Sequence, residues 1–255
     1  MITRRLFAAS ALATIPGLAL AAPTTSDLSL DQVIARHTTA RGGARALDAV
    51  HAMRADLVIS EQGASLKAAW RATLDHLMRI DVALGDKRVW SEGVDKAGPW
   101  AWPGGKPEPA PSGGDAERAL RHGMDFNLVG LHAFPALGHR LTLAGRETLD
   151  GVALYVVQID MADGFRTFRY IDPRSWMITR SRDIRALHPD ADPTQKLLEN
   201  VYEDFRPVSG VQVSFASRQV DVATGKVLQQ TRLTAQAHNP PLAGLNLGRA
   251  EPSLV

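Results

Sequence analysis

The sequence contains few residue patterns that could support catalysis, and this narrows the chemistry open to the chain. It has no cysteine, which excludes a thiol nucleophile, a disulfide framework and a cysteine-based zinc site. The motifs G-x-S-x-G, S-x-x-K, H-E-x-x-H and G-x-G-x-x-G are absent, as is a P-loop. The eight histidines are scattered, and none has the H-x-H or H-x-x-x-H spacing that suits a metal. We therefore expect no enzyme, no catalytic residue, no metal and no cofactor.

One segment is rich in charged side chains that could instead bind an anion. Its arginines are Arg166, Arg169, Arg174, Arg180, Arg182 and Arg185. They could hold an anionic headgroup. Aspartates are interspersed with them, at Asp160, Asp163, Asp172 and Asp183. This mixture favours a neutralised outer face of a strand-rich domain over a headgroup site.

The first residues have the pattern of an export signal. Arg4 and Arg5 precede an apolar stretch that ends in Ala19-Leu20-Ala21, the small-x-small pattern that a signal peptidase cleaves. The stretch is shorter than the roughly 20 residues that a membrane helix needs. We predict a cleavable signal peptide over residues 1–21. It resembles a twin-arginine signal, and an ordinary secretory signal is the alternative. No cysteine stands at the cleavage site, so the mature chain is expected to be periplasmic, soluble and not lipid-anchored.

Charge and length limit the partners and the domain count. The formal net charge is +2, and Arg4 and Arg5 account for this excess. Nucleic acid is therefore not an expected partner, because phosphate binding needs clustered cationic excess. The remaining residues, 22–255, suffice for one domain with a sizeable core.

Hydrophobic periodicity predicts helices first and then many strands. Residues 29–40 have helical spacing, with Ser29 or Asp31 as the cap, and a short helix over 44–50 follows. From residue 52 the apolar period becomes two, which is typical of half-buried antiparallel strands. The expected strands cover residues 52–60, 65–74, 78–84, 87–93, 152–160, 165–172, 176–183, 196–205, 211–222 and 226–237. One more strand is expected to begin at about residue 140 and to end before a connection over residues 145–151.

The middle of the chain interrupts this pattern. Residues 99–114 are rich in proline and glycine, which predicts a long irregular loop carrying Trp100 and Trp102. Asp115 can cap the helix that follows. Its apolar stripe contains Ala116, Leu120, Met124, Leu128 and Leu131. The stripe either closes the core or forms a lid over a cavity, with the two tryptophans at its mouth.

The order of several short motifs resembles the outer-membrane lipoprotein-sorting (LolA-like) superfamily of periplasmic carriers. These motifs are Ala40-Arg41-Gly42-Gly43, Met78-Arg79-Ile80-Asp81, Gly145-Arg146-Glu147 with Asp150-Gly151, Tyr170-Ile171-Asp172-Pro173, the segment from Tyr202 to Val211, and Asn239-Pro240-Pro241-Leu242. The resemblance covers most of residues 22–255. It implies an α+β fold, in which a curved, incomplete antiparallel β-barrel wraps around helices and leaves an apolar cavity.

The resemblance also implies a function, which is to carry a lipid, an acyl chain or a lipoprotein across an aqueous compartment, with an inner- or outer-membrane partner for transfer. From the apolar faces of the strands we predict a cavity lined by Trp70, Met78, Ile80, Trp90, Tyr155, Val157, Ile159, Phe168, Tyr170, Val213 and Phe215. The predicted lid or mouth consists of Trp100, Trp102, Leu120, Met124 and Leu128. The alternatives are an interaction module without ligand, in which the tryptophan loop docks on a partner, and an exported hydrolase.

Overall fold

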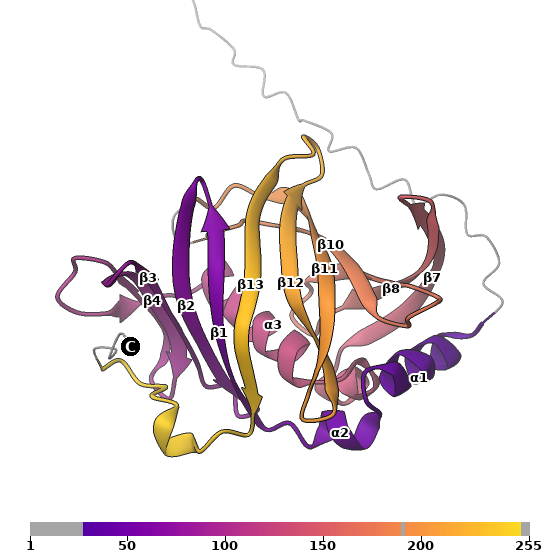
Figure 1. The fold of residues 1–255 in the computed structure, drawn as a ribbon, viewed down its shortest axis with the longest axis horizontal. Coiled ribbons are helices and arrows are strands. Elements are labelled where there is room, and N and C mark those ends of the chain that lie inside the picture. Colours follow the sequence, from indigo (N-terminus) through magenta and orange to yellow (C-terminus); the bar gives the residue numbers. More distant parts are fainter. Residues whose placement is uncertain (1–27, 190–191, 251–255) are drawn as a thin grey trace, which may run out of the picture.

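A computed structural model of the protein describes residues 28–189 and 192–250. Within these ranges thirteen strands form one antiparallel sheet with the spatial order β6-β5-β4-β3-β2-β1-β13-β12-β11-β10-β9-β8-β7 (Figure 1). The strands are β1 (Ala52–Glu61), β2 (Ala64–Thr73), β3 (Met78–Leu84), β4 (Lys87–Asp95), β5 (Gly98–Pro103), β6 (Ala110–Pro111), β7 (Arg140–Leu149), β8 (Val152–Asp160), β9 (Arg166–Ile171), β10 (Ile178–Arg185), β11 (Lys196–Val208), β12 (Val211–Asp221) and β13 (Val227–His238).

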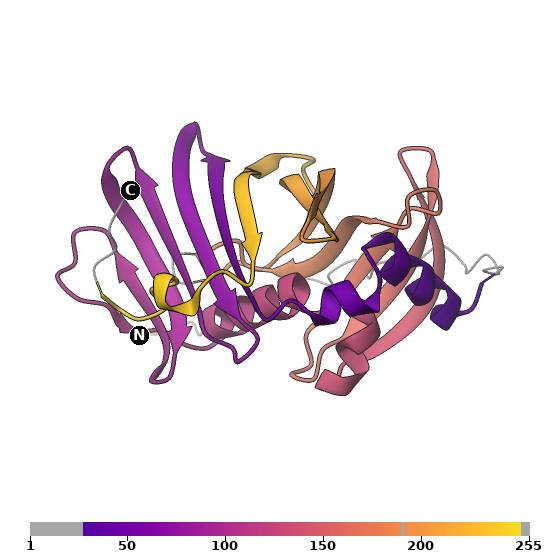
Figure 2. The same ribbon diagram turned by 60° about the horizontal axis from the view of Figure 1, so that its bottom comes forward.

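The sheet is curved and remains open, which confirms the predicted fold class. Its order begins at β6 and ends at β7, so these two strands are the free edges of the described sheet. Most neighbours are hairpins, and the exception is the pairing of β1 with β13, which joins the two ends of the strand series. Figure 2 shows the strands curling around the helices on the concave side.

Five helical segments accompany the sheet in the described ranges. They are α1 (Leu30–Ala40), α2 (Ala44–Asp48), α3 (Asp115–Leu128) and the 3₁₀ helices η1 (Leu131–Leu137) and η2 (Leu242–Gly244). Ser29 caps α1 in a capping box with Gln32, which decides between the two predicted caps. The part of the chain that the structure describes contains no helix with the length and apolarity needed to cross a membrane.

Two predictions about the middle of the chain were wrong. Residues 98–103 and 110–111 form β5 and β6 instead of a continuous loop. The strands form because Pro99 and Pro103 lie near the ends of β5, at the sheet's edge, where few backbone N–H groups are needed for pairing. The N-cap of α3 is Gly114, so Asp115 is the first helical residue and its side chain makes no cap.

The concave face carries two separate hydrophobic clusters. The first lies over β1–β4 and contains Met53, Ala72, Met78, Met124 and Leu128. The second lies over β8 and β9 and packs against α1 and η1, with Val33, Phe134, Val157, Ile159 and Ile171 buried in it. Strands β11–β13 lie between the two groups of strands in the sheet order, and they carry few members of either cluster. The space beneath them is where packing is incomplete.

Candidate ligand cavity

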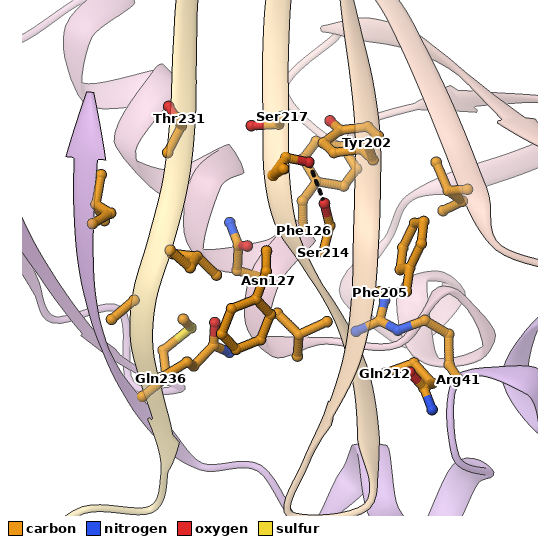
Figure 3. A pocket seen from close by; sticks show the side chains of 18 of the residues that line it. Arg41, Phe126, Asn127, Tyr202, Phe205, Gln212, Ser214, Ser217, Thr231 and Gln236 are labelled. Atoms are coloured by element: carbon orange, nitrogen blue, oxygen red, sulfur yellow. Dashed lines mark hydrogen bonds between the residues drawn. The ribbon is translucent and has the colours of Figure 1, made fainter. Parts of the chain in front are cut away.

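A cavity of about 320 Å³ lies between the two clusters. It is bounded by strands β11, β12 and β13, by the C-terminal half of α3 and by the end of α1 (Figure 3). Its volume is near the lower end of the range of small-molecule sites, roughly 300–1,000 Å³. Its size suits one small ligand or one alkyl tail.

The side of the cavity formed by β1–β3 is entirely apolar. Met53, Ala55, Leu57, Trp70 and Ile80 line it there, and all five belong to or pack against the first hydrophobic cluster. They lie on one face because residues two apart on a strand point the same way, and cross-strand partners such as Trp70 and Ile80 share a face.

The opposite side carries polar and aromatic groups. Arg169 of β9 lies with its guanidinium carbon 3.7 Å from the centre of the Phe126 ring and donates to Tyr202 Oη at 3.2 Å. Arg41 follows the last residue of α1, and its guanidinium points into the cavity beneath Phe205 (Figure 3). Both arginines line the cavity.

His37 is the buried titratable group of this wall. It is 1% exposed and donates from Nδ1 to the carbonyl oxygen of Trp176 at 2.8 Å. The pKa of His37 is lowered to about 4, chiefly by burial and in smaller part by the charge of Arg41, while the Trp176 hydrogen bond opposes this shift. His37 is therefore neutral at physiological pH and adds no charge to the cavity.

The structure places four of the eleven predicted lining residues at this cavity. These are Trp70, Ile80, Val213 and Phe215. Met78 and Trp90 are instead part of, or packed on, the first cluster, because α3 covers that end of the concave face. Tyr155, Val157 and Ile159 also face inward, but α1 and η1 cover them completely as the second cluster.

Phe168 and Tyr170 correct the predicted facing of β9. They form a third cluster with Leu154 and Val156, on the face opposite to the cavity. Arg169, between them in the strand, is the residue that points inward. The prediction assumed that the aromatic side chains mark the inner face. Strand β9 is buried on both faces, so its period-two alternation does not say which face meets the cavity.

The predicted lid residues also lie elsewhere. Trp100 and Trp102 are 0% and 4% exposed, and they pair with Gly93 and Ser91 on the face opposite to Ile80. The guanidinium groups of Arg79 and Arg88 lie over their rings. The two tryptophans are thus on the convex face and are not at the mouth. Met124 and Leu128 are buried in the first cluster with Leu120 packed on it, so the α3 stripe closes the core.

Sequence reasoning missed the residues that give the cavity its polar side. Arg41, Phe126, Tyr202 and Phe205 line it, and none was predicted to do so. Phe126 carried a usable signal, because it is an aromatic residue outside the apolar stripe of its helix. The sequence gives no comparable signal for Arg41 beyond its position after a predicted helix, because the direction of its side chain depends on how α1 meets β12.

A second hollow of about 620 Å³ lies outside the concave face, near the C-terminal segment. Its walls carry charges of both signs, including Arg54, Asp56, Lys67, Asp81 and Asp86. A surface of mixed charge is typical of a solvated groove, so the smaller apolar-walled cavity is the better candidate for a hydrophobic ligand.

Solved structures share this architecture. A DUF1329 family protein from Desulfovibrio piger matches with a TM-score of 0.54 and 10% sequence identity, over 86% of this chain and 96% of that chain. A LolA superfamily protein from Nitrosomonas europaea matches with a TM-score of 0.52 and 9% sequence identity, over 82% of this chain and 93% of that chain. The chain has the LolA-like fold. No protein-family model and no curated protein matches its sequence. The LolA-like fold here keeps the open sheet and inner helices, and its cavity is the space that these elements leave unfilled.

Proposed function

We propose that this protein is a periplasmic carrier that binds one hydrophobic ligand, a lipid or acyl chain, in the cavity beneath β11–β13. The observation that carries the proposal is the cavity of about 320 Å³ with an apolar wall from β1–β3, inside a LolA-like sheet. Binding, not catalysis, is the role that this wall suits.

The energetics favour such a site. An alkyl chain in water costs about 0.8 kcal/mol per exposed methylene group, so a carrier must provide apolar surface away from water. The cavity lining provides Leu57, Trp70 and Ile80 from β1–β3 for this purpose, together with Phe215 of β12 and Leu233 of β13. These side chains lose little conformational entropy when a ligand binds, because the helices already hold the sheet in its curved form.

The predicted export signal supports the periplasmic part of the proposal. Residues 1–21 have the signal-peptide pattern, and they lie outside the described residues. A carrier in that compartment would receive its ligand at one membrane and release it at the other, so a transfer partner at either membrane is part of the proposal.

The alternative of a partner-docking tryptophan loop loses its main support in the structure. Trp100 and Trp102 are buried under arginine side chains, whereas an interface anchor must be exposed before binding.

The proposal is tested with a neutral hydrophobic fluorophore, N-phenyl-1-naphthylamine, which brightens in apolar surroundings. The purified mature protein should bind about one equivalent with micromolar affinity, and organic extraction of the protein as isolated should yield lipid by mass spectrometry. Absence of both would refute the carrier function. Cleavage after Ala21 is checked on the same sample by its intact mass.

A further inference from the structure

The charge balance of the cavity wall is uneven. Two arginines, Arg41 and Arg169, line it, whereas the described lining residues include no aspartate or glutamate. The other polar lining groups are neutral hydroxyls and amides together with the neutral imidazole of His37. A wall of this composition leaves about two positive charges facing one cavity.

Arg41 has no carboxylate partner among the described residues. Its side-chain Nε is buried without a hydrogen bond, and burial lowers the pKa of its guanidinium. Its charge acts on its neighbours, because it lowers the pKa of His238 in addition to the larger effect of burial there. No carboxylate of the described residues cancels this positive potential at the end of α1.

Arg169, in the middle of β9, also has no carboxylate partner among the described residues. It is 6% exposed, and its partners are the neutral Phe126 ring and the Tyr202 hydroxyl. Its Nε is also buried without a partner. Four neighbouring arginines are paired, which shows that this part of the protein does not lack acids. These pairs are Arg166 with Asp160, Arg180 with Glu199, Arg182 with Glu147 and Glu199, and Arg185 with Asp183.

The two kinds of wall are separated along the sheet. The apolar wall belongs to β1–β3, whereas Arg41 follows α1 and Arg169 lies on β9. Strands β13, β12, β11 and β10 lie between β1 and β9 in the sheet order. A buried cation without a counter-ion is costly, and an anion in the cavity would offset that cost. Guanidinium groups bind carboxylate and phosphate oxygens with charge-assisted hydrogen bonds.

We propose that the ligand is an anionic amphiphile, whose carboxylate or phosphate headgroup binds Arg41 and Arg169 while its alkyl tail lies along Leu57, Trp70 and Ile80. This inference rests on the proposed function and adds the chemical class of the ligand. The sequence favoured a neutralised outer face over a headgroup site for the arginine-rich segment. The ion pairs of four of its other members support that interpretation, and this inference gives the headgroup role to Arg169 alone.

The test is displacement of N-phenyl-1-naphthylamine by dodecanoate, dodecyl phosphate, dodecanol and acetate at pH 8, with the two anionic amphiphiles below their micelle concentrations and dodecanol below its solubility limit. Dodecanoate or dodecyl phosphate should bind at least about tenfold more tightly than dodecanol, and acetate should not compete. Added salt should weaken the binding of dodecanoate and dodecyl phosphate and leave the affinity for dodecanol unchanged.

Variants locate the effect. Arg41→Met and Arg169→Met should each bring the affinity for dodecanoate towards that for dodecanol without weakening dodecanol binding, and Arg169→Lys should keep part of the preference. Arg166→Met is the matched control, because Arg166 lies on β9 with Asp160 as its partner and does not line the cavity. Thermal unfolding of each variant shows that it is folded.

The outcomes separate the two proposals. If the neutral fluorophore binds and dodecanol competes as well as dodecanoate, the anionic headgroup is wrong and the carrier function stands. If acetate competes as well as dodecanoate, the site is for a free anion and the amphiphile is wrong. If neither the fluorophore nor any dodecyl compound binds, both proposals fail.

Discussion

The backbone N–H of Gln212 donates to the carbonyl oxygen of Arg41 at 2.9 Å, which joins the end of α1 to the start of β12. The side chains of both residues line the cavity (Figure 3). This single backbone contact therefore sets where the guanidinium of Arg41 enters the cavity, although the two residues are far apart in the sequence.

Gly42 permits that contact, and its replacement should be costly. Its φ is 121°, and an added Cβ would lie 2.1 Å from the carbonyl oxygen of Gly210. We expect Gly42→Ala to lower the free energy of unfolding by more than about 2 kcal/mol, measured by urea denaturation. Gly113→Ala is the control, because an added Cβ there meets nothing within 4 Å. Equal stabilities of the two variants would contradict the described junction.

Filling the cavity should block ligand binding without unfolding the protein. Ser217 lines the cavity from β12 and pairs with Tyr202 and Thr231, which also line it. Ser217→Phe should weaken N-phenyl-1-naphthylamine binding by about tenfold or more, because the added ring occupies the space of the ligand. Ala235→Phe on the exposed side of β13 adds the same ring elsewhere and should bind normally. Normal fluorophore binding by both variants would mean that the ligand site lies outside this cavity.

Ile159 and Ile80 should differ in their contribution to stability. Ile159 is 0% exposed within the second cluster, so Ile159→Ala should cost about 3 kcal/mol in urea denaturation and leave fluorophore binding intact. Ile80 already borders the cavity, so Ile80→Ala removes fewer packing contacts and should cost less while it weakens binding. The reverse order of the two costs would place the void next to Ile159.

The convex face depends on one shared carboxylate. Glu199 is 6% exposed and accepts from Arg180 at 2.7 Å and from Arg182 at 2.6 Å. Glu199→Gln should destabilise the protein by about 3 kcal/mol, because it leaves two partly buried cations with less compensation. Asp204→Asn, which changes an exposed pair with Arg206, should leave the denaturation midpoint unchanged. A Glu199→Gln midpoint equal to that of the wild type would mean that water already compensates the two arginines.

Acid should destabilise the protein through His37. The unfolded chain binds a proton near pH 6.5, whereas burial holds the pKa of folded His37 at about 4. Between these values the unfolded state binds more protons, so stability falls as pH decreases from 6.5 to 4 and this contribution levels off below 4, with about 3 kcal/mol lost in total. His37→Asn should remove this part of the pH dependence in denaturation curves recorded between pH 7 and pH 4. An unchanged slope in that variant would assign the acid sensitivity to other groups.

The sequence by itself determined the fold class, the α-helices and most of the strands, and β5 and β6 are the strands that it missed. Period-two alternation from residue 52 onward gave the strands, and Ser29 with the helical spacing after it gave α1. These signals are local, since they depend on which neighbours along the chain share a face. The resemblance of the short motifs to the LolA-like superfamily added the curvature and the open sheet, which the structure confirms.

Tertiary structure alone decided which face of each strand meets the cavity and where packing is incomplete. Strand β9 alternates Phe168, Arg169 and Tyr170, and both of its faces are buried, so only the positions of α3 and β10 show that Arg169 is the inner residue. The position of the cavity is likewise not marked by any local sequence pattern. It exists because α3 fills the space over β3 and α1 with η1 fills the space over β8, and neither reaches the space beneath β12.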